Sequence, residues 1–164
     1  MASGPRYSVK FRRRRLGKTN YRKRRLMIVS RKPRLVVRKT NKFIISQIIN
    51  YDVNGDRTVA SANSNELRAL GWKRGLKNLP AAYLTGYLIA KKAIKAKITE
   101  PITDLGIYTI TKGSKLFSFL KGAIDGGLKI NVDKKNLPSE ERIMGKHISE
   151  DVAKDFDAIK GKIK

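Results

Sequence analysis

The sequence predicts a mixed α/β fold: a mixed sheet built in the order β-β-β-α-β-α, helices packed on it, a basic N-terminal extension and a peripheral C-terminal tail. Three observations predict it. Residues 34–62 are rich in β-branched residues and are divided by turn signals, as consecutive strands are. Two stretches after residue 80 repeat apolar side chains at helical spacing. The first 51 residues contain 17 Lys or Arg and no Asp or Glu, unlike the rest of the chain.

The basic extension contains one predicted helix. Thr19 or Asn20 can cap its first turn, and the helix should run to about Ser30 and end before Pro33. The first turns are almost entirely basic, whereas the last turn is apolar. We expect this apolar end to dock on the folded body through Leu26, Ile28 and Val29.

The next segment is predicted to form three antiparallel strands. Residues 34–40 and 43–52 have strand composition, and the short link between them suits a hairpin. Asn54 and Gly55 both tolerate positive φ, so they predict a type I′ turn that leads into a third strand over 57–62. The middle strand is apolar on both faces, and we expect helices to cover each side of it.

Two helices should follow the third strand. Ser64 can cap a short helix that ends near Gly71. Pro80 suits the first turn of a longer helix, in which apolar residues form a stripe and the lysines fall mostly elsewhere. Pro101 ends that helix.

A fourth strand and a second long helix complete the predicted body. Residues 102–110 have strand composition and are followed by a turn from Thr111 to Ser114. The helix after this turn has one apolar face and ends at the pair Gly126-Gly127.

These elements divide the chain into a basic arm (1–33), an α/β body (34–132) and a C-terminal tail (133–164). The 164 residues suffice for one domain with a modest core and an arm. The tail carries 7 acidic and 8 basic residues, so its charge is nearly balanced. We expect a short helix from Ser149 to Lys160 and a peripheral position for the whole tail.

Composition argues against an enzyme. The absence of cysteine excludes disulfides and thiolate metal sites. The one histidine, His147, has no nucleophile at a catalytic spacing, and Asp104 and Asp125 are interpreted as a turn residue and a helix-end residue rather than a metal pair. We therefore expect no catalysis, no metal and no cofactor. Because no apolar run approaches the roughly 20 residues that span a bilayer, and no secretory signal is present, we expect a soluble intracellular protein without a membrane partner.

The acid-free arm is the most specific signal. The first acid is Asp52, so the segment before it accounts for +17 of the formal net charge of +25. Such one-sided charge opposes compaction and predicts a polyanionic partner. Arginine dominates the segment, and guanidinium groups bind phosphates in a bidentate manner and stack on bases. Stacking could also come from Tyr7, Phe11, Tyr21 and Trp72.

Charge alone leaves other interpretations open. The arginine run could be a localisation signal or simply a solvated tract. A DNA-packaging protein is the sharper rival, but no helix-turn-helix, zinc knuckle or RNA-recognition motif is present. The combination of an arm, a folded body and basic loops favours an RNA of fixed shape.

The turn from Thr111 to Lys115 is a candidate phosphate loop. It lacks the four residues between two glycines that a nucleotide-binding P-loop needs. A tight turn with free backbone N–H groups at a helix N-terminus, beside Lys112 and Lys115, could hold one phosphate of a nucleic acid. An ordinary strand-to-helix turn accounts equally well for these residues.

Several stretches resemble a known family in order and spacing. They are GPRYSVKFRRRRLGKTNYRKRRL, SRKPRLVVRKTNKFIISQII, YDVNGDRTVASANSNEL, GWKRGLKNLPAAYLTGYLIAKKA, TDLGIYTITKGSKLFSFLKGAIDGGL and LPSEERIMGKHI. Together they are similar to the archaeal form of the 5S rRNA-binding proteins of the large ribosomal subunit, the family conventionally numbered eighteen. The resemblance covers about residues 4–148, and the last stretch of the chain matches nothing in it.

The resemblance implies a non-catalytic, cytoplasmic ribosomal protein. It would bind 5S rRNA and help to attach it to the large-subunit rRNA in the central protuberance, beside neighbouring large-subunit proteins. The fold of that family, a mixed α/β sandwich with an N-terminal extension, agrees with the fold predicted from pattern.

The resemblance also implies a set of RNA-binding residues. In the arm these are Arg12, Arg13, Arg14, Arg15, Lys18, Asn20, Tyr21, Arg22, Arg24 and Arg25. The end of the arm and the first hairpin add Arg31, Lys32, Arg34, Arg38, Asn41 and Lys42. Later loops add Trp72, Lys73, Arg74, Lys112 and Lys115.

Two other functions remain as competing hypotheses. A free-standing nucleic-acid chaperone or chromatin protein would release 5S rRNA to bulk duplex DNA. An RNA-processing enzyme would turn over labelled RNA in the presence of a divalent metal.

Overall fold

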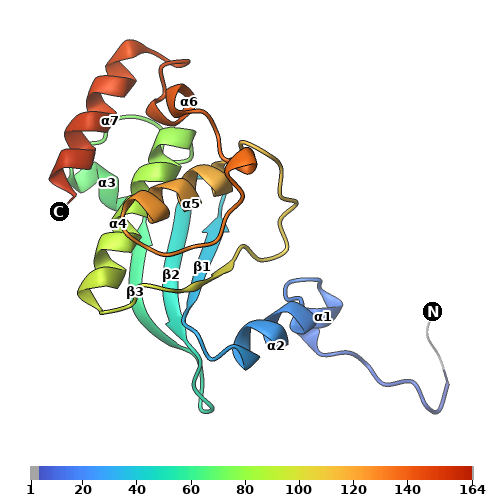
Figure 1. Ribbon diagram of the computed structural model, residues 1–164. Coiled ribbons are helices and arrows are strands. Elements are labelled where there is room, and N and C mark those ends of the chain that lie inside the picture. Colours follow the sequence, from blue (N-terminus) through green and yellow to red (C-terminus); the bar gives the residue numbers. More distant parts are fainter. Residues whose placement is uncertain (1–3, 164) are drawn as a thin grey trace.

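The computed structural model describes residues 4–163 and confirms the predicted mixed α/β fold (Figure 1). Residues 1–3 of the arm and Lys164 of the tail lie outside the described residues. The elements, in chain order, are α1 (Arg12–Arg15), α2 (Tyr21–Val29), β1 (Arg34–Lys39), β2 (Ile44–Asn50), β3 (Arg57–Asn63), α3 (Glu66–Ala69), α4 (Leu79–Lys95), β4 (Ile102–Asp104), α5 (Lys115–Asp125), the 3₁₀ helix η1 (Lys134–Asn136), α6 (Glu140–Met144) and α7 (Glu150–Lys162).

The four strands form one mixed sheet in the order β3-β2-β1-β4. The first three pair antiparallel, as predicted, and β4 lies parallel to β1 at the edge. The predicted fourth strand over 102–110 is too long, because β4 ends at Asp104. The Asp104 carboxylate accepts the backbone N–H of Gly106 at 2.9 Å, and Gly106 has a φ of +70°. This turn, which a side chain two residues earlier stabilises, directs the chain away from the sheet.

The connection between β2 and β3 also differs from the prediction. Asn50 faces Arg57 across the sheet, so six residues join the strands instead of the four between the predicted strands. The chain reverses through Val53 and Asn54, and the N–H of Gly55 donates to the carbonyl of Asp52 at 3.2 Å. Neither Val53 nor Asn54, the central residues of this turn, has a positive φ, so the predicted type I′ turn is wrong. The longer loop brings the carboxylate of Asp56 to an arginine of β1, a contact described below.

Helices α4 and α5 lie over one face of the sheet (Figure 1). That face supplies Leu35, Val37, Ile44 and Ile48, each at most 1% exposed, to the main apolar core with the two helices. The other face, with Ile45 and Ile49 half-buried, is bordered by the arm and by the loop after β4. The expectation that helices cover both sides of the middle strand is therefore wrong.

The two long helices cross at a contact between glycine and backbone. A Cβ atom on Gly86 would overlap the carbonyl oxygen of Phe119, and one on Gly122 would overlap the carbonyl oxygen of Tyr83. The Tyr83 hydroxyl, which donates to Asp125 at 2.7 Å, also links the helices. Burial and then this hydrogen bond raise the pKa of Tyr83 above its ordinary value.

The C-terminal segment is part of the folded body. The predicted helix is confirmed as α7, but its apolar side packs into a second core. Phe156, at 2% exposed, contacts the Tyr83 ring with 5.2 Å between the ring centroids. Val152, Ile159 and Ile163 are buried in the same cluster. The prediction of a peripheral tail is therefore wrong for this part of the chain, since its apolar residues close the core around α4.

Within residues 4–163, no helix is long and apolar enough to cross a membrane. The same residues contain no group of three or more His, Cys, Asp or Glu side chains that could hold a metal ion.

Candidate nucleic-acid interface

The basic arm forms two short helices that leave the sheet at the end opposite to α6 (Figure 1). The α2 helix begins as predicted, because the side chain of Asn20 accepts the N–H of Lys23 at 3.1 Å. In α1, the side chains of Arg12 to Arg15 are all exposed. The Arg13 Nε donates to the Thr19 hydroxyl at 2.9 Å, which holds the two helices together across Gly17.

The charges of the arm are not neutralised within the protein. In the described part of the chain, Arg24 is the one cation of α1 and α2 that contacts a carboxylate. Aromatic groups are also exposed here, with Phe11 at 84% and Tyr21 at 40%. Exposed guanidinium groups beside exposed rings are the combination that binds phosphates and stacks on bases.

The apolar end of α2 does not dock as expected. Leu26 is 67% exposed and Val29 is 70% exposed, whereas Ile28 is half-buried. Contact between α2 and the body depends instead on charge. The Arg24 guanidinium donates to Asp56 at 2.8 Å, so the long loop after β2 reaches back to the arm.

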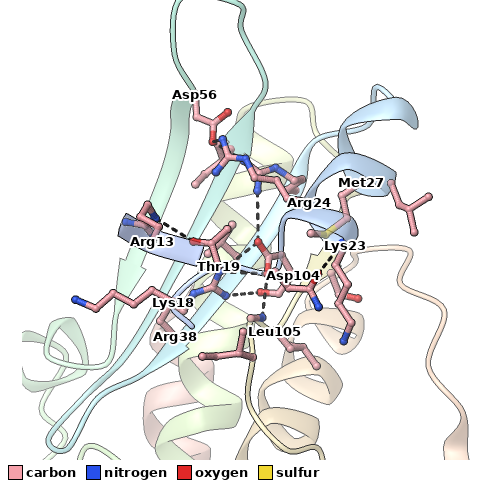
Figure 2. A pocket seen from close by; sticks show the side chains of 18 of the residues that line it. Arg13, Lys18, Thr19, Lys23, Arg24, Met27, Arg38, Asp56, Asp104 and Leu105 are labelled. Atoms are coloured by element: carbon pink, nitrogen blue, oxygen red, sulfur yellow. Dashed lines mark hydrogen bonds and ion pairs between the residues drawn. The ribbon is translucent and has the colours of Figure 1, made fainter. Parts of the chain in front are cut away.

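A chain of ion pairs runs from this contact into the sheet (Figure 2). Arg34, at 4% exposed, donates to Asp56 at 2.6 Å and to Asp104 at 3.4 Å. Arg38 donates to both oxygens of the Asp104 carboxylate, at 3.1 and 3.2 Å, and to its backbone carbonyl at 2.8 Å. Three cations from the arm and β1 therefore share two carboxylates, one from the β2–β3 loop and one from β4.

This network changes the interpretation of three predicted RNA-binding residues. Arg34 is buried between two carboxylates, which identifies it as a residue that positions neighbouring groups rather than one that is open to RNA. Arg24 and Arg38 are partly exposed, but each already binds a carboxylate. Asp104 is a turn residue, as predicted, and also the acceptor for two arginines, which sequence alone did not indicate.

Removing the charge of Asp104 should destabilise the protein. In Asp104→Asn the buried guanidinium of Arg34 loses one counter-charge, and breaking a buried pair in this way costs roughly 3 kcal/mol. Urea unfolding would measure the loss. The matched control is Asp52→Asn, because Asp52 is exposed and contacts no cation within 4 Å among residues 4–163. Equal midpoints for the two variants would contradict a stabilising role of the network.

The arm and the body enclose a groove beside these ion pairs. It has a volume of about 480 Å³ and is lined by arm residues such as Asn20 and Met27, by the open face of the sheet, and by the loop after β4. Ile107 and Ile110, from that loop, are 59% and 49% exposed. Cationic side chains therefore line one part of the groove, and the apolar side chains of Ile107 and Ile110 line another.

The predicted residues of the later loops have different surroundings. Trp72 is 2% exposed, and its indole N–H donates to the Gly75 carbonyl at 3.1 Å, so no ring face is open to a base. The expectation that Trp72 contacts RNA is therefore wrong. Arg74 donates to Asp155 of α7 at 3.0 Å, whereas Lys73 is exposed.

The remaining predicted residues lie at the far end of β1 from the arm. Asn41 and Lys42 are exposed at the tip of the β1–β2 hairpin, and Lys112 and Lys115 are exposed around the start of α5. The structure therefore separates the predicted residues into an arm group and a hairpin group, with the length of β1 between them. Arg31 and Lys32, both exposed, belong to the arm group, and Lys32 contacts Glu100 at 3.5 Å.

Known proteins resemble this chain over most of its length. A family model described as "Ribosomal large subunit proteins 60S L5, and 50S L18" matches residues 5–101. The chain is 54% identical over 149 residues to the large ribosomal subunit protein uL18 of Korarchaeum cryptofilum, an alignment that covers 91% of this chain and 76% of that protein. It is 48% identical to uL18 of Methanospirillum hungatei over 174 residues, with 99% of each chain covered. With uL18 of Methanothermobacter thermautotrophicus the identity is 51%, over 92% of this chain and 78% of that protein.

The alignment with the Methanospirillum protein covers 99% of this chain and so includes the C-terminal helix α7, which lies beyond the stretches that carry the resemblance. The length of these alignments and their sequence identity both show that the chain belongs to the family of large ribosomal subunit proteins that comprises 60S L5 and 50S L18.

Proposed function

We propose that this protein is a structural component of the large subunit of the cytoplasmic ribosome that binds 5S rRNA and helps to attach it to the large-subunit rRNA in the central protuberance. It is not an enzyme in this proposal. The observation that carries the proposal is the exposed arginine run of α1, which has no carboxylate partner in the described chain and extends from a rigid α/β body. Membership of a family of ribosomal proteins supports it.

The mechanism follows from the charges. Phosphates packed closely in a folded RNA repel one another, and guanidinium groups inserted among them reduce this repulsion while releasing bound counterions. The arm supplies these groups. The contact of Arg24 with Asp56 already restricts the orientation of α2, so less conformational entropy is lost when RNA binds. Phosphate contacts fix position and orientation but carry no sequence information, so the shape of the RNA has to provide selectivity.

The body acts as a spacer in this mechanism. The arm group lies at one end of β1 and the hairpin group at the other, so two RNA segments, from 5S rRNA and from large-subunit rRNA, can be held at a fixed separation. Neighbouring large-subunit proteins would contact surfaces that RNA leaves open, among them the acidic side chains of α7.

A competition experiment tests the proposal. The purified protein should retain labelled 5S rRNA against an excess of duplex DNA or heparin, and it should co-sediment with large subunits after a high-salt wash. A nucleic-acid chaperone would instead release the RNA to either polyanion. Loss of 5S rRNA to heparin at the same concentration of negative charge would overturn the proposal.

A further inference from the structure

A second basic cavity lies at the hairpin end of the sheet, away from the arm. It has a volume of about 550 Å³. Its walls come from the tip of the β1–β2 hairpin, the turn before α5, the segment before α4, and α6. These four segments are far apart in the sequence, so no local motif indicates that they meet.

Four cationic side chains line this cavity, and no acidic residue does. Lys39 comes from β1, Lys77 precedes α4, Lys115 begins α5 and Arg142 belongs to α6. Among residues 4–163, none of the four lies within 4 Å of a carboxylate. Cations that face one cavity without a counter-ion repel one another, and a bound anion would remove this cost.

Neutral donors at the same place add to the charges. The first N–H groups of α5, an 11-residue helix, have no partner inside the helix, and the side chain of the N-cap residue Ser114 does not accept any of them. The Ser114 hydroxyl oxygen is itself buried and has no hydrogen-bond partner among the described residues. A buried hydroxyl beside free N–H groups and ammonium groups matches the acceptor oxygens of a phosphate.

One side chain is fixed in place by an aromatic ring. The Nζ of Lys39 lies 4.9 Å from the centroid of the Tyr108 ring, and the Tyr108 hydroxyl donates to the Lys39 carbonyl at 2.8 Å. These contacts restrict the Lys39 ammonium before any ligand binds, so less side-chain entropy is lost on binding.

We infer that this cavity, which we call the hairpin pocket, binds neighbouring phosphate groups of an RNA backbone independently of the arm. The inference rests on the proposed function, since it takes RNA as the source of the phosphate. Free phosphate has the same chemistry, but one such ion offsets at most two of the four charges, whereas an RNA strand brings several phosphates to the same cavity. The exposed side chains of Lys42 and Lys112 continue the positive surface beyond the pocket, as a polymer requires.

The pocket gives the C-terminal segment a role in binding. Arg142 is the contribution of α6, and α6 is held against α4 because Ile143 is buried in the second core. Glu140 and Glu141 belong to the same helix but do not line the cavity. Packing of the C-terminal segment therefore presents a cation to the pocket and keeps the neighbouring carboxylates out of it.

The test is a salt titration of 5S rRNA binding with Lys77→Ala/Arg142→Ala. Each lost phosphate contact reduces the slope of log K against log salt by about 0.7–0.9, so the double variant should bind roughly 10-fold more weakly at moderate salt, with a slope lower by about 1.5. The control is Lys95→Ala/Lys154→Ala, which removes the same charge from exposed positions outside the pocket. Equal slopes for the two double variants would overturn the inference.

A second measurement separates the sources of phosphate. In the wild-type protein, amide NMR signals of residues 114–117 should shift on addition of a short RNA helix from 5S rRNA and barely change with the same concentration of inorganic phosphate. Shifts with inorganic phosphate alone would contradict an RNA site. Lys115→Glu, an exposed change, should reduce RNA binding without lowering the unfolding midpoint.

The outcomes also separate this inference from the proposed function. If wild-type protein prefers 5S rRNA over heparin and the pocket variant matches its control, the hairpin pocket alone is wrong. If wild-type protein shows no such preference, the proposed function is wrong, whatever the pocket variant does.

Discussion

Replacing Arg12 to Arg15 together by alanine should weaken 5S rRNA binding by roughly 10²–10³-fold at physiological salt. All four side chains are exposed and none contacts a carboxylate in the described chain, so each is free to neutralise a phosphate. Four lost contacts would also reduce the slope of log K against log salt by about 3. Alanine favours helix, so the backbone of α1 should persist in the variant. A filter-binding titration at several salt concentrations measures both quantities.

A control variant separates the effect of the charges in α1 on RNA affinity from the effect of the protein's net charge. Replacing Lys95, Lys134, Lys135 and Lys154 by alanine removes the same four charges from exposed positions on the body, away from the arm. Its slope should stay close to that of the wild-type protein. Should the two variants lose affinity in parallel, the arm would contribute only to the net charge, and the assignment of α1 as the principal RNA contact would be wrong.

Local signals in the sequence were sufficient for the elements that depend on local contacts. The start of α2 follows from Asn20, whose side chain bonds within the first helical turn. The first hairpin follows from strand composition and a short link, and α4 follows from Pro80 in its first turn and the apolar stripe behind it. These elements need little information from distant parts of the chain.

Distant contacts account for the predictions that were wrong. The turn signal of Asn54 and Gly55 was overridden by a longer loop, in which Asp56 binds Arg34 and Arg24. The fourth strand is short because the carboxylate of Asp104 accepts the nearby N–H of Gly106, and two distant arginines of β1 hold this carboxylate in place. No sequence neighbour of either acid predicts its arginine partners.

The C-terminal segment is a second example of the same limit. Its charge balance suggested a peripheral tail, but Phe156 and its apolar neighbours close a core formed by residues from α3, α4 and the loop between them. That loop contains Trp72, which lies beside basic residues in the sequence and was therefore predicted to stack on RNA. In the structure Trp72 is buried in this core. Sequence composition reports the charge of a segment but not which apolar groups come together.

The candidate site shows the same division. Composition alone was enough to identify the arm, because an absence of acids over 51 residues needs no structure to be recognised. It could not separate Arg34, which is buried with two carboxylates, from Arg12, which is exposed. It also missed Lys39, Lys77 and Arg142, since only the fold brings these three cations to one cavity.

Gly86→Ala should destabilise the protein by about 3 kcal/mol or more. The added Cβ would overlap the backbone carbonyl of Phe119, and backbone cannot rotate away as a flexible side chain can. Helices α4 and α5 would have to separate, which would open the main core along its length. The contact is reciprocal, since Gly122 meets the Tyr83 carbonyl in the same way. Because both substitutions would strain one crossing, the double variant should lose less stability than the sum of the single losses.

A matched control lies in α7. Gly161 is also helical, but a Cβ there would have no atom within 4 Å, so Gly161→Ala should leave stability unchanged or raise it by up to about 1 kcal/mol. Urea unfolding of the two variants compares the same chemical change with and without a backbone contact. If Gly86→Ala were as stable as Gly161→Ala, α4 and α5 could not approach each other at Gly86 as closely as the structure shows. Because the sheet, the second core and the hairpin pocket are all built against α4 or α5, this crossing is the contact on which their relative positions depend.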